Sequence, residues 1–544
     1  MFTDPIKQKI KRLQLGGKPR VLDIFAGCGG LSLGFHSAGF EIVGAVECDP
    51  LAAESHAMNF YKNMPEEIRR VHTTARDITI TEPEQLVSEL LLSTDVSNAI
   101  DIIIGGPPCQ AFARVGRSKL REVADHPEAF RLDPRANLYL RYLHYVKSLR
   151  PLALLMENVP DALNYGGHNI AEEMCEALTE NGYTCGYTLL NAVYYGIPQM
   201  RERMFLIAYA NELKTQVNFP KPTHWIEIPR GYEGSRQVAL KHLSVKNQNK
   251  ISTESDLLNI NNFCSYISPP IPHRGLERAI SASEAIGDLP PITLHLEGKL
   301  KRGAKRFTTL TPYSENLEHS SYALRLRQWE GFEGNGGVKD HIIRTLSQRD
   351  FEIFRRMLPG EQYPEAYKHA IDILNEELDH LKQSNRNVKF GSAEYCALKK
   401  KIVPPYDQYK FPNKWRKMEA NKPTRTLMAH LGKDSYSHIH YDSNQARTIS
   451  VREAARLQSF PDGFIFAGTM NPAFRQIGNA VPPLLAAVIA NQMLEQIQRA
   501  IICQENLLSK DLPASREVID ASDHVLGICP DPLTRYILSL SRSA

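Results

Sequence analysis

Between residues 20 and 210, short apolar runs alternate with longer stretches whose apolar residues have helical spacing. We predict strands at 20–25, 41–47, 100–104, 151–157 and 203–210, and a further strand that ends near Asp77. We predict helices at 29–39, 50–60 and 137–149. Strands that alternate with helices in this way are typical of a doubly wound, mostly parallel α/β sheet. Such sheets bind ligands beyond the carboxyl ends of their strands, so we expect the functional residues there.

The regular pattern stops near residue 210 and returns near residue 430. Prolines, polar runs and short mixed segments fill the interval, so we expect a smaller, irregular domain at 211–430. Two helices are predicted after it, at 481–497 and at 450–460, where Ser450 and Glu453 form a capping box. A domain that begins with 1–210 is therefore expected to be completed by 431–500. Residues 501–544 form a C-terminal extension to which the sequence assigns no role.

Composition is that of an ordinary soluble globular protein, since 42% of the 544 residues are hydrophobic and 23% are charged. No apolar run approaches the roughly 20 residues of a membrane span, and the first residues lack the apolar core of a signal peptide. The nine cysteines are an odd number and include no C-x-x-C pair. We therefore expect a reducing cytoplasm, no disulfide framework and no metal site.

The first predicted strand is followed by a glycine-rich loop with the sequence Asp23-Ile-Phe-Ala-Gly-Cys-Gly-Gly, and Glu47 ends the second strand. Glycines permit close approach of a ligand to the backbone, and a carboxylate accepts hydrogen bonds from ribose hydroxyls. A dinucleotide enzyme is the obvious alternative, but Ser32 stands where the G-x-G-x-x-G fingerprint has its third glycine. Asp77 is a candidate partner for an adenine amino group. Together these features favour an adenosyl ligand.

A second group of polar residues surrounds the loop with the sequence Gly105-Gly-Pro-Pro-Cys-Gln, which follows the strand at 100–104. A thiolate is a strong nucleophile, so Cys109 is a candidate for covalent catalysis. Glu157 ends the next strand and can face the same substrate, while Arg201 and Arg203 supply nearby cations. The alternatives are a proline turn with an incidental cysteine, a glutamate that caps a strand or forms an ion pair, and arginines on a solvated edge.

Six blocks resemble the cytosine carbon-5 DNA methyltransferases of prokaryotic restriction–modification type. They are 23–35, Pro107-Pro-Cys-Gln, Glu157-Asn-Val, Gln199-x-Arg-x-Arg, Arg452-Glu-Ala-Ala-Arg-Leu-Gln-Ser-Phe-Pro and Gln476-Ile-Gly-Asn-Ala-Val-Pro. The resemblance implies a Rossmann-like fold, S-adenosyl-L-methionine as methyl donor and duplex DNA as partner. It further implies that Cys109 attacks carbon 6 of a flipped-out cytosine, that Glu157 bonds ring nitrogen 3 and the amino group, and that Arg201 and Arg203 support the base. The interval 211–430 falls where the family carries its target-recognition domain.

The resemblance also implies a set of cofactor-binding residues: Phe25, Gly27, Gly29, Gly30, Leu31, Glu47, Cys48, Asp77, Ile78, Pro108 and Asn479. Members of the family often have an aromatic residue where this chain has Cys48, so we expect no aromatic stacking on the adenine from this position. Residues 111–135 are predicted to form a mobile loop that closes over the flipped base, and the alternative is a static surface loop. A cognate restriction endonuclease as functional partner and a solitary role are both open, and no membrane is expected. The alternatives are the tRNA-methylating branch of the fold and a catalytically inactive DNA-binding or cofactor-sensing protein.

Positive charge is concentrated at 382–425, where twelve basic and three acidic residues give +9 in a chain of net charge +4. Six aromatic residues are interleaved with them: Phe390, Tyr395, Tyr406, Tyr409, Phe411 and Trp415. This pattern favours a surface that contacts DNA phosphates, and the alternative is a solvated face. A second basic cluster is Lys299, Lys301, Arg302, Lys305 and Arg306.

Overall fold

The computed structural model describes residues 4–108, 137–164, 168–229, 232, 236–241, 265–299, 309–344, 346–432 and 435–510. The predicted nucleophile Cys109 and the predicted loop at 111–135 lie outside the described residues. The same holds for most of the second basic cluster, of which only Lys299 is described. The chain divides into two compact units, Met1–Ile501 and Ile502–Ala544, and the features below belong to the first.

A six-stranded sheet forms the centre of the protein, with the strand order β2-β1-β3-β4-β7-β5. In chain order the strands are β1 (Arg20–Ile24), β2 (Glu41–Val46), β3 (Ile102–Gly105), β4 (Ala153–Asn158), β5 (Tyr183–Asn191) and β7 (Glu202–Ala210). The first four pair in parallel, whereas β7 runs antiparallel to β4 and β5. Apolar side chains fill both faces of β3 and β4, as expected for parallel strands covered on both sides. The predicted α/β class with a mostly parallel sheet is confirmed.

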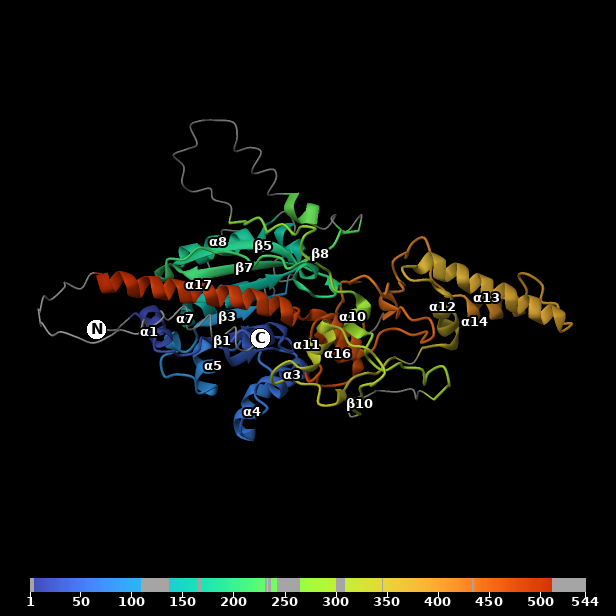
Figure 1. Ribbon diagram of the computed structural model, residues 1–544, viewed down its shortest axis with the longest axis horizontal. Coiled ribbons are helices and arrows are strands. Elements are labelled where there is room, and N and C mark those ends of the chain that lie inside the picture. The colour runs from blue at the N-terminus through green and yellow to red at the C-terminus, as the bar shows by residue number, and fades with distance from the viewer. Residues whose placement is uncertain are drawn as a thin grey trace, which may run out of the picture. The chain divides into compact units, whose positions relative to one another are not determined.

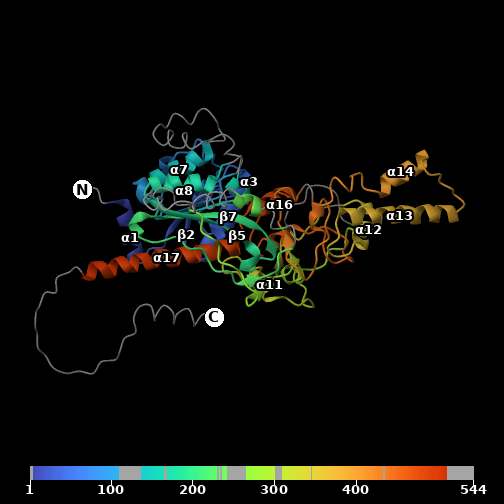
Figure 2. The same ribbon diagram turned by 90° about the horizontal axis from the view of Figure 1, so that it is seen from above.

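Helices cover both faces of this sheet (Figures 1 and 2). The helices before the central region are α1 (Pro5–Gln14), α2 (Gly30–Ser37), α3 (Pro50–Phe60), α4 (Glu66–Thr73), α5 (Pro83–Glu89), α7 (Asn137–Leu149) and α8 (Ile170–Glu180). Figure 2 shows α7 and α8 on one side of the strands and α17 (Pro483–Lys510) on the other. Helix α2 packs closely on α17, because a Cβ added at Gly34 would lie 2.3 Å from the Cβ of Ala486. The late segment therefore packs against the first elements of the chain.

One predicted strand is absent, and two elements were missed. No strand ends at Asp77: this segment makes one backbone hydrogen bond beside β2, from Arg76 N to Glu47 O at 2.7 Å. The Asp77 carboxylate then accepts hydrogen bonds from the backbone and hydroxyl of Thr79, which turns the chain. Strand β5 and helix α8 were not predicted. Because β5 is buried along most of its length and contains Gly186, it lacks the alternating pattern of a half-exposed strand.

The central region contains more regular structure than predicted. Its helices are α10 (Ala282–Ile286), α11 (Ser321–Arg327), α12 (Gln348–Arg356), α13 (Tyr363–Gln383) and α14 (Ala393–Ile402). The sequence did carry a signal for α13, namely Pro364 in the first turn and apolar residues at helical spacing thereafter. The apolar residues of α10 and α11 join the main core, whereas residues from Leu346 to Ala446 contribute to a second core around Trp415.

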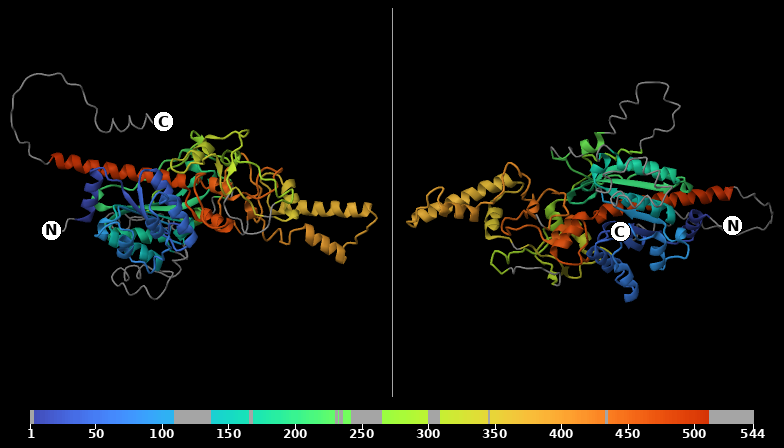
Figure 3. Two further views of the ribbon diagram at one scale, coloured as in Figure 1. Left: turned by 90° about the horizontal axis from the view of Figure 1, so that it is seen from below. Right: turned by 180° about the vertical axis from the view of Figure 1, so that it is seen from behind.

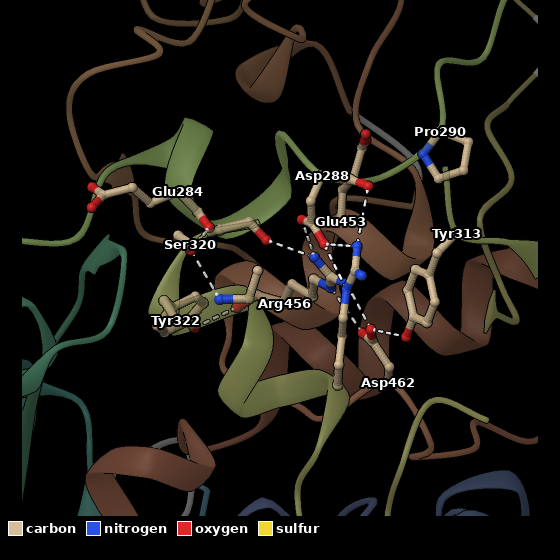
Figure 4. A network of polar contacts seen from close by, with 12 residues as sticks. Glu284, Asp288, Pro290, Tyr313, Ser320, Tyr322, Glu453, Arg456 and Asp462 are labelled. Carbon is tan, nitrogen blue, oxygen red and sulfur yellow. Dashed lines mark hydrogen bonds and ion pairs between the residues drawn. The ribbon is translucent and has the colours of Figure 1, made fainter. Parts of the chain in front are cut away.

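Buried arginines join the central region to α15 (Val451–Leu457), which is followed along the chain by α16 (Met470–Asn479). Helix α15 has the predicted capping box. The Arg456 guanidinium donates to Asp462 and to Asp288, beside α10, and its side chain is fully buried (Figure 4). Arg327 of α11 bonds the same Asp288 at 2.5 Å. Because each charge in this network is paired, removal of one partner is expected to leave an uncompensated buried charge.

One helical stretch among the described residues, Met470–Cys503, is long and apolar enough to span a membrane by length and composition. Its most apolar window has a mean hydropathy of 1.3, and 67% of that window is buried inside the protein. Ile489 and Met493 belong to the main core. These contacts are typical of the core helix of a folded domain.

Candidate active site

A cavity of about 530 Å³ lies at the carboxyl ends of β1, β2, β3 and β4. Ten of the eleven predicted cofactor residues line it, all but Gly29, and so do Glu157, Arg201 and Arg203. Its volume is within the range of pockets that bind small organic ligands. The sheet thus brings the two groups of residues singled out from the sequence to one space.

Gly29 does not line the cavity. It precedes α2 with φ of 99°, and a Cβ there would lie 2.5 Å from the Phe60 ring. Its role is to let the chain enter α2 against α3. Residues that line the cavity but were not predicted include Arg76, Leu138, Leu427, Met428 and Ala429. No spacing signal marks 427–429, whereas Ala480 and Val481, which also line it, belong to the last of the six sequence blocks.

The glycine-rich loop is held in a strained conformation. Phe25 has φ of 60°, which is uncommon for a residue other than glycine, and its N–H donates to Val46 O at 2.8 Å. The two Glu47 carboxylate oxygens accept hydrogen bonds from Gly27 N at 2.8 Å and Asp49 N at 2.7 Å. The loop and the acidic residue predicted to bind ribose are therefore one hydrogen-bonded unit, and each oxygen retains acceptor capacity.

Ser32, the residue in place of the third glycine, lies beneath this loop in a fully buried chain of hydrogen bonds. Its hydroxyl donates to Asp23 Oδ2 at 2.6 Å and is 2.9 Å from His56 Nε2. Burial raises the pKa of Asp23 to about 7 and lowers the pKa of His56 to about 3. This chain of hydrogen bonds links β1 and α2, which precede and follow the loop, to α3, which begins three residues after Glu47.

Ser32→Ala is expected to weaken binding of S-adenosyl-L-homocysteine about tenfold, because it removes the hydroxyl that donates to buried Asp23 and loosens the loop. Isothermal titration calorimetry measures this effect, with thermal unfolding recorded alongside. Asp23→Asn, which keeps an acceptor for Ser32, should lose less affinity. The exposed Ser37→Ala in the last turn of α2 is the control. Unchanged affinity in a folded Ser32→Ala variant would contradict this role.

The loop that leads to Cys109 is fixed by glycines and by the asparagine next to Glu157. A Cβ at Gly105 would lie 2.2 Å from Ile24 O, and one at Gly106 would lie 2.9 Å from Glu157 Oε2. Both glycines therefore permit close approach of another group to the backbone. Asn158 Nδ2 donates to Pro107 O at 2.9 Å and to the hydroxyl of Tyr139 at 2.6 Å. The backbone is thereby anchored two residues before the predicted nucleophile.

Glu157 is a mostly buried carboxyl group that faces a cation. Its Oε1 lies 3.0 Å from Arg203 Nε, and the two side chains are 12% and 13% exposed. Burial raises the pKa of Glu157, while Arg203 and Arg201 counter part of that shift. A carboxyl group with a raised pKa keeps its proton to higher pH than an exposed glutamate does, and it can donate that proton to a ring nitrogen.

Arg201 holds two walls of the cavity in place. Its guanidinium donates to Leu427 O and to Gly478 O, both at 3.0 Å, and the side chain is 1% exposed. Gln199 binds the same segment, accepting from Leu427 N at 2.9 Å. Arg201 therefore positions the segments that contain Leu427 and Gly478, whereas Arg203 pairs with Glu157.

The basic region at 382–425 is only partly available to a partner. Lys417 is buried and donates to Phe354 O and Met357 O at 2.8 Å, so its prediction as a phosphate contact is wrong. Trp415 is also fully buried. Arg386 pairs with Glu394, and Lys422 with Glu419, each at 2.6 Å. The exposed basic residues are Lys382, Arg386, Lys389, Lys399, Lys400, Lys401, Lys410 and Lys422.

Comparison with known proteins agrees with this site. The family of C-5 cytosine-specific DNA methylases matches residues 19–274 and 314–495. M.OihORF3336P of Oceanobacillus iheyensis, named among the type II methyltransferases, is 36% identical over 486 residues, which are 89% of this chain and 97% of that protein. Type II methyltransferase M.AgeI of Thalassovita gelatinovora is 28% identical, with 87% of this chain and 98% of that protein covered.

A solved structure shares the fold: a DNA modification methyltransferase encoded within an E. coli prophage, with a TM-score of 0.55 and 21% identity. The alignment covers 88% of this chain and all of that one. The chain belongs to the C-5 cytosine-specific DNA methylases. It is a DNA (cytosine-5)-methyltransferase, and its methyl donor is S-adenosyl-L-methionine.

Proposed function

We propose that this enzyme methylates a flipped-out cytosine in a specific duplex sequence through a transient covalent bond to Cys109. Carbon 5 of cytosine is a poor nucleophile, and addition of the Cys109 thiolate at carbon 6 makes it electron-rich. When bound, S-adenosyl-L-methionine supplies an electrophilic methyl group. Loss of the proton from carbon 5 then expels the thiolate and restores the ring. Carbon 6 is inaccessible in a stacked duplex, so the base must leave the helix.

The observation that carries this proposal is the single cavity shared by the two sets of residues. Pro108, which precedes Cys109, lines it together with Glu157 and with Glu47. A donor held near Glu47 and a base held near Glu157 would therefore meet without a wall between them. Glu157 would donate a proton to ring nitrogen 3, which stabilises the negative charge that develops on the ring, and Arg203 would orient it.

The residues around the glycine-rich loop suit an adenosyl amino acid. Helix α2 has no side-chain cap, and Gly30 and Leu31 of its first turn line the cavity, so its free N–H groups are available to a carboxylate. Glu47 would bind the ribose hydroxyls and Asp77 the adenine amino group, with Phe25, Ile78 and Pro108 as apolar walls. Cys48 lines the same cavity and would pack against the adenine in place of an aromatic ring.

The central region, 211–430, is proposed as the target-recognition domain inserted between the two parts of the catalytic domain, 1–210 and 431–500. The separate core between Leu346 and Ala446 supports an independent substructure there. A large insertion favours duplex DNA over tRNA as the substrate. An intact set of Cys109, Glu157 and both arginines favours an active enzyme over a catalytically inactive relative.

The type II relatives favour a role in restriction–modification, in which methylation protects cytoplasmic DNA at the nucleoid from a cognate endonuclease. Bisulfite or nanopore sequencing of a plasmid from cells that express the protein tests the proposal. We expect 5-methylcytosine at one position of one short sequence, wherever that sequence occurs. A plasmid without 5-methylcytosine, or methylation of tRNA alone, would contradict it.

A further inference from the structure

Helices α13 and α14 form an arm whose outer part has little hydrophobic anchoring. We define the helical arm as residues 363–402. The fully buried residues of α13, Tyr363, Ala366, Ala370 and Leu374, lie in the first twelve of its 21 residues, and α14 has none. Helix α14 rests beside α13 (Figure 3) through half-buried Tyr395, Leu398 and Ile402. The outer half of α13 and all of α14 therefore keep most of their surface in solvent.

Charge is distributed unevenly over the helical arm. Helix α14 ends in three successive exposed lysines, Lys399, Lys400 and Lys401, and none of them forms an ion pair among the described residues. The exposed surface of α13 is acidic instead, with Asp372, Glu376, Glu377 and Asp379. Lysines in a last turn are favourable for the helix dipole, which by itself explains a positive end. The exposed aromatic residues nearby have no such explanation.

Large apolar side chains are also open to solvent in the two segments that flank α14 along the chain. Phe390 is 86% exposed next to Lys389, and Tyr409 is 85% exposed next to Lys410. Phe411 is 52% exposed. Basic residues interleaved with exposed aromatic residues are typical of a surface that binds nucleic acid, where the lysines contact phosphates and the rings cover sugars or bases.

The arm is anchored to the same segment that reaches the active site. Its core includes Trp415 and Ile439, which flank the residues Leu427–Ala429 along the chain. Those residues line the active-site cavity and are held there by Arg201. The arm's core and the cavity wall are therefore connected by about a dozen residues of chain on either side. A helix of 21 residues is ~30 Å long, roughly the length of nine base pairs.

We propose that Lys389, Lys399, Lys400, Lys401 and Lys410 bind the phosphates of duplex DNA outside the recognition sequence. This surface, the basic face of the arm, comprises lysines of α14 and of the two segments that flank it along the chain. We expect the DNA on this side because the exposed residues of α13 carry a net negative charge. Lysine contacts phosphate as a point charge without the planar geometry that arginine uses to recognise a guanine edge. The arm therefore adds affinity for flanking DNA of any sequence. The inference rests on the proposed DNA substrate and extends it to a second contact.

Binding of duplexes with different flank lengths tests this proposal. Fluorescence anisotropy gives Kd for ~12 and ~35 base-pair duplexes that carry the methylated sequence, with S-adenosyl-L-homocysteine present. In the wild type we expect the longer duplex to bind more tightly. In the triple variant Lys399→Ala, Lys400→Ala, Lys401→Ala we expect this advantage to shrink about tenfold. For the long duplex, the slope of log Kd against log salt concentration should decrease by the equivalent of up to about three phosphate contacts.

Lys368→Ala on the acidic side of α13 is the matched control and should keep the wild-type advantage of the long duplex. All substitutions are at exposed positions, and melting temperatures show whether the fold is kept. An unchanged long-duplex advantage in the triple variant would overturn the proposal, and so would an equal loss on both duplexes. Plasmid sequencing tests the proposed function separately from this second contact. If sequencing identifies no methylated sequence, random-sequence duplexes of both lengths replace the target duplexes in the binding measurement.

Discussion

Cys109→Ser is expected to abolish methylation while cofactor binding stays close to that of the wild type. A serine hydroxyl is far less ionised than a thiol near neutral pH, so the attack on carbon 6 loses its nucleophile. Among the described residues, Glu47 accepts from Gly27 N and Asn158 donates to Pro107 O, and these contacts should keep the form of the cavity. Methyl transfer from radiolabelled S-adenosyl-L-methionine to plasmid DNA measures the activity, and calorimetry with S-adenosyl-L-homocysteine measures the binding.

The control for this prediction is Cys503→Ser, which changes an exposed cysteine far along the chain from the site. It should methylate DNA at the wild-type rate. Full activity in Cys109→Ser would remove Cys109 from the mechanism. A variant that also fails to bind the cofactor analogue would instead assign Cys109 a role in forming the cavity.

Glu157→Gln is expected to lower kcat about a hundredfold or more, because an amide cannot transfer a proton to ring nitrogen 3. The side chains are nearly the same size, and Gln can still accept a hydrogen bond from Arg203, so DNA affinity should change much less than kcat. Single-turnover rates at saturating DNA separate the chemical step from binding. The exposed Glu54→Gln on α3 is the matched control.

The pH profile distinguishes this role from a structural one. Burial raises the pKa of Glu157, so its protonated form persists to higher pH than that of an exposed glutamate. The rate should rise with pH as the thiol ionises and fall once Glu157 loses its proton. In Glu157→Gln the falling limb should disappear. A falling limb that persists unchanged would show that another group donates the proton.

Much of the catalytic fold was predictable because its signals are local. Strands such as β1 and helices such as α3 and α7 follow from apolar runs, a proline at the first turn and short connections. The carboxyl ends of parallel strands lie at one edge of a sheet, so the sequence alone placed Glu47 and Glu157 in one region. By contrast, β5 pairs antiparallel with β7, but it is buried along most of its length and its sequence shows no clear alternation.

The roles of the two arginines could not be separated from sequence. Both lie in one short motif, yet Arg203 turns toward Glu157 whereas Arg201 binds carbonyl oxygens of residues 427 and 478. Those partners are more than 200 positions away in the chain. The burial of Lys417 among carbonyl oxygens was hidden for the same reason, since charge counts do not reveal which lysines face inward.

Covalent trapping tests the central claim most directly. In DNA that carries 5-fluorocytosine at the methylated position, fluorine replaces the proton whose loss releases the enzyme. With S-adenosyl-L-methionine present, we expect a stable protein–DNA complex, and mass spectrometry of its peptides should place the nucleotide on Cys109. Absence of this complex under conditions in which ordinary target DNA is methylated, or attachment at another residue, would contradict the mechanism.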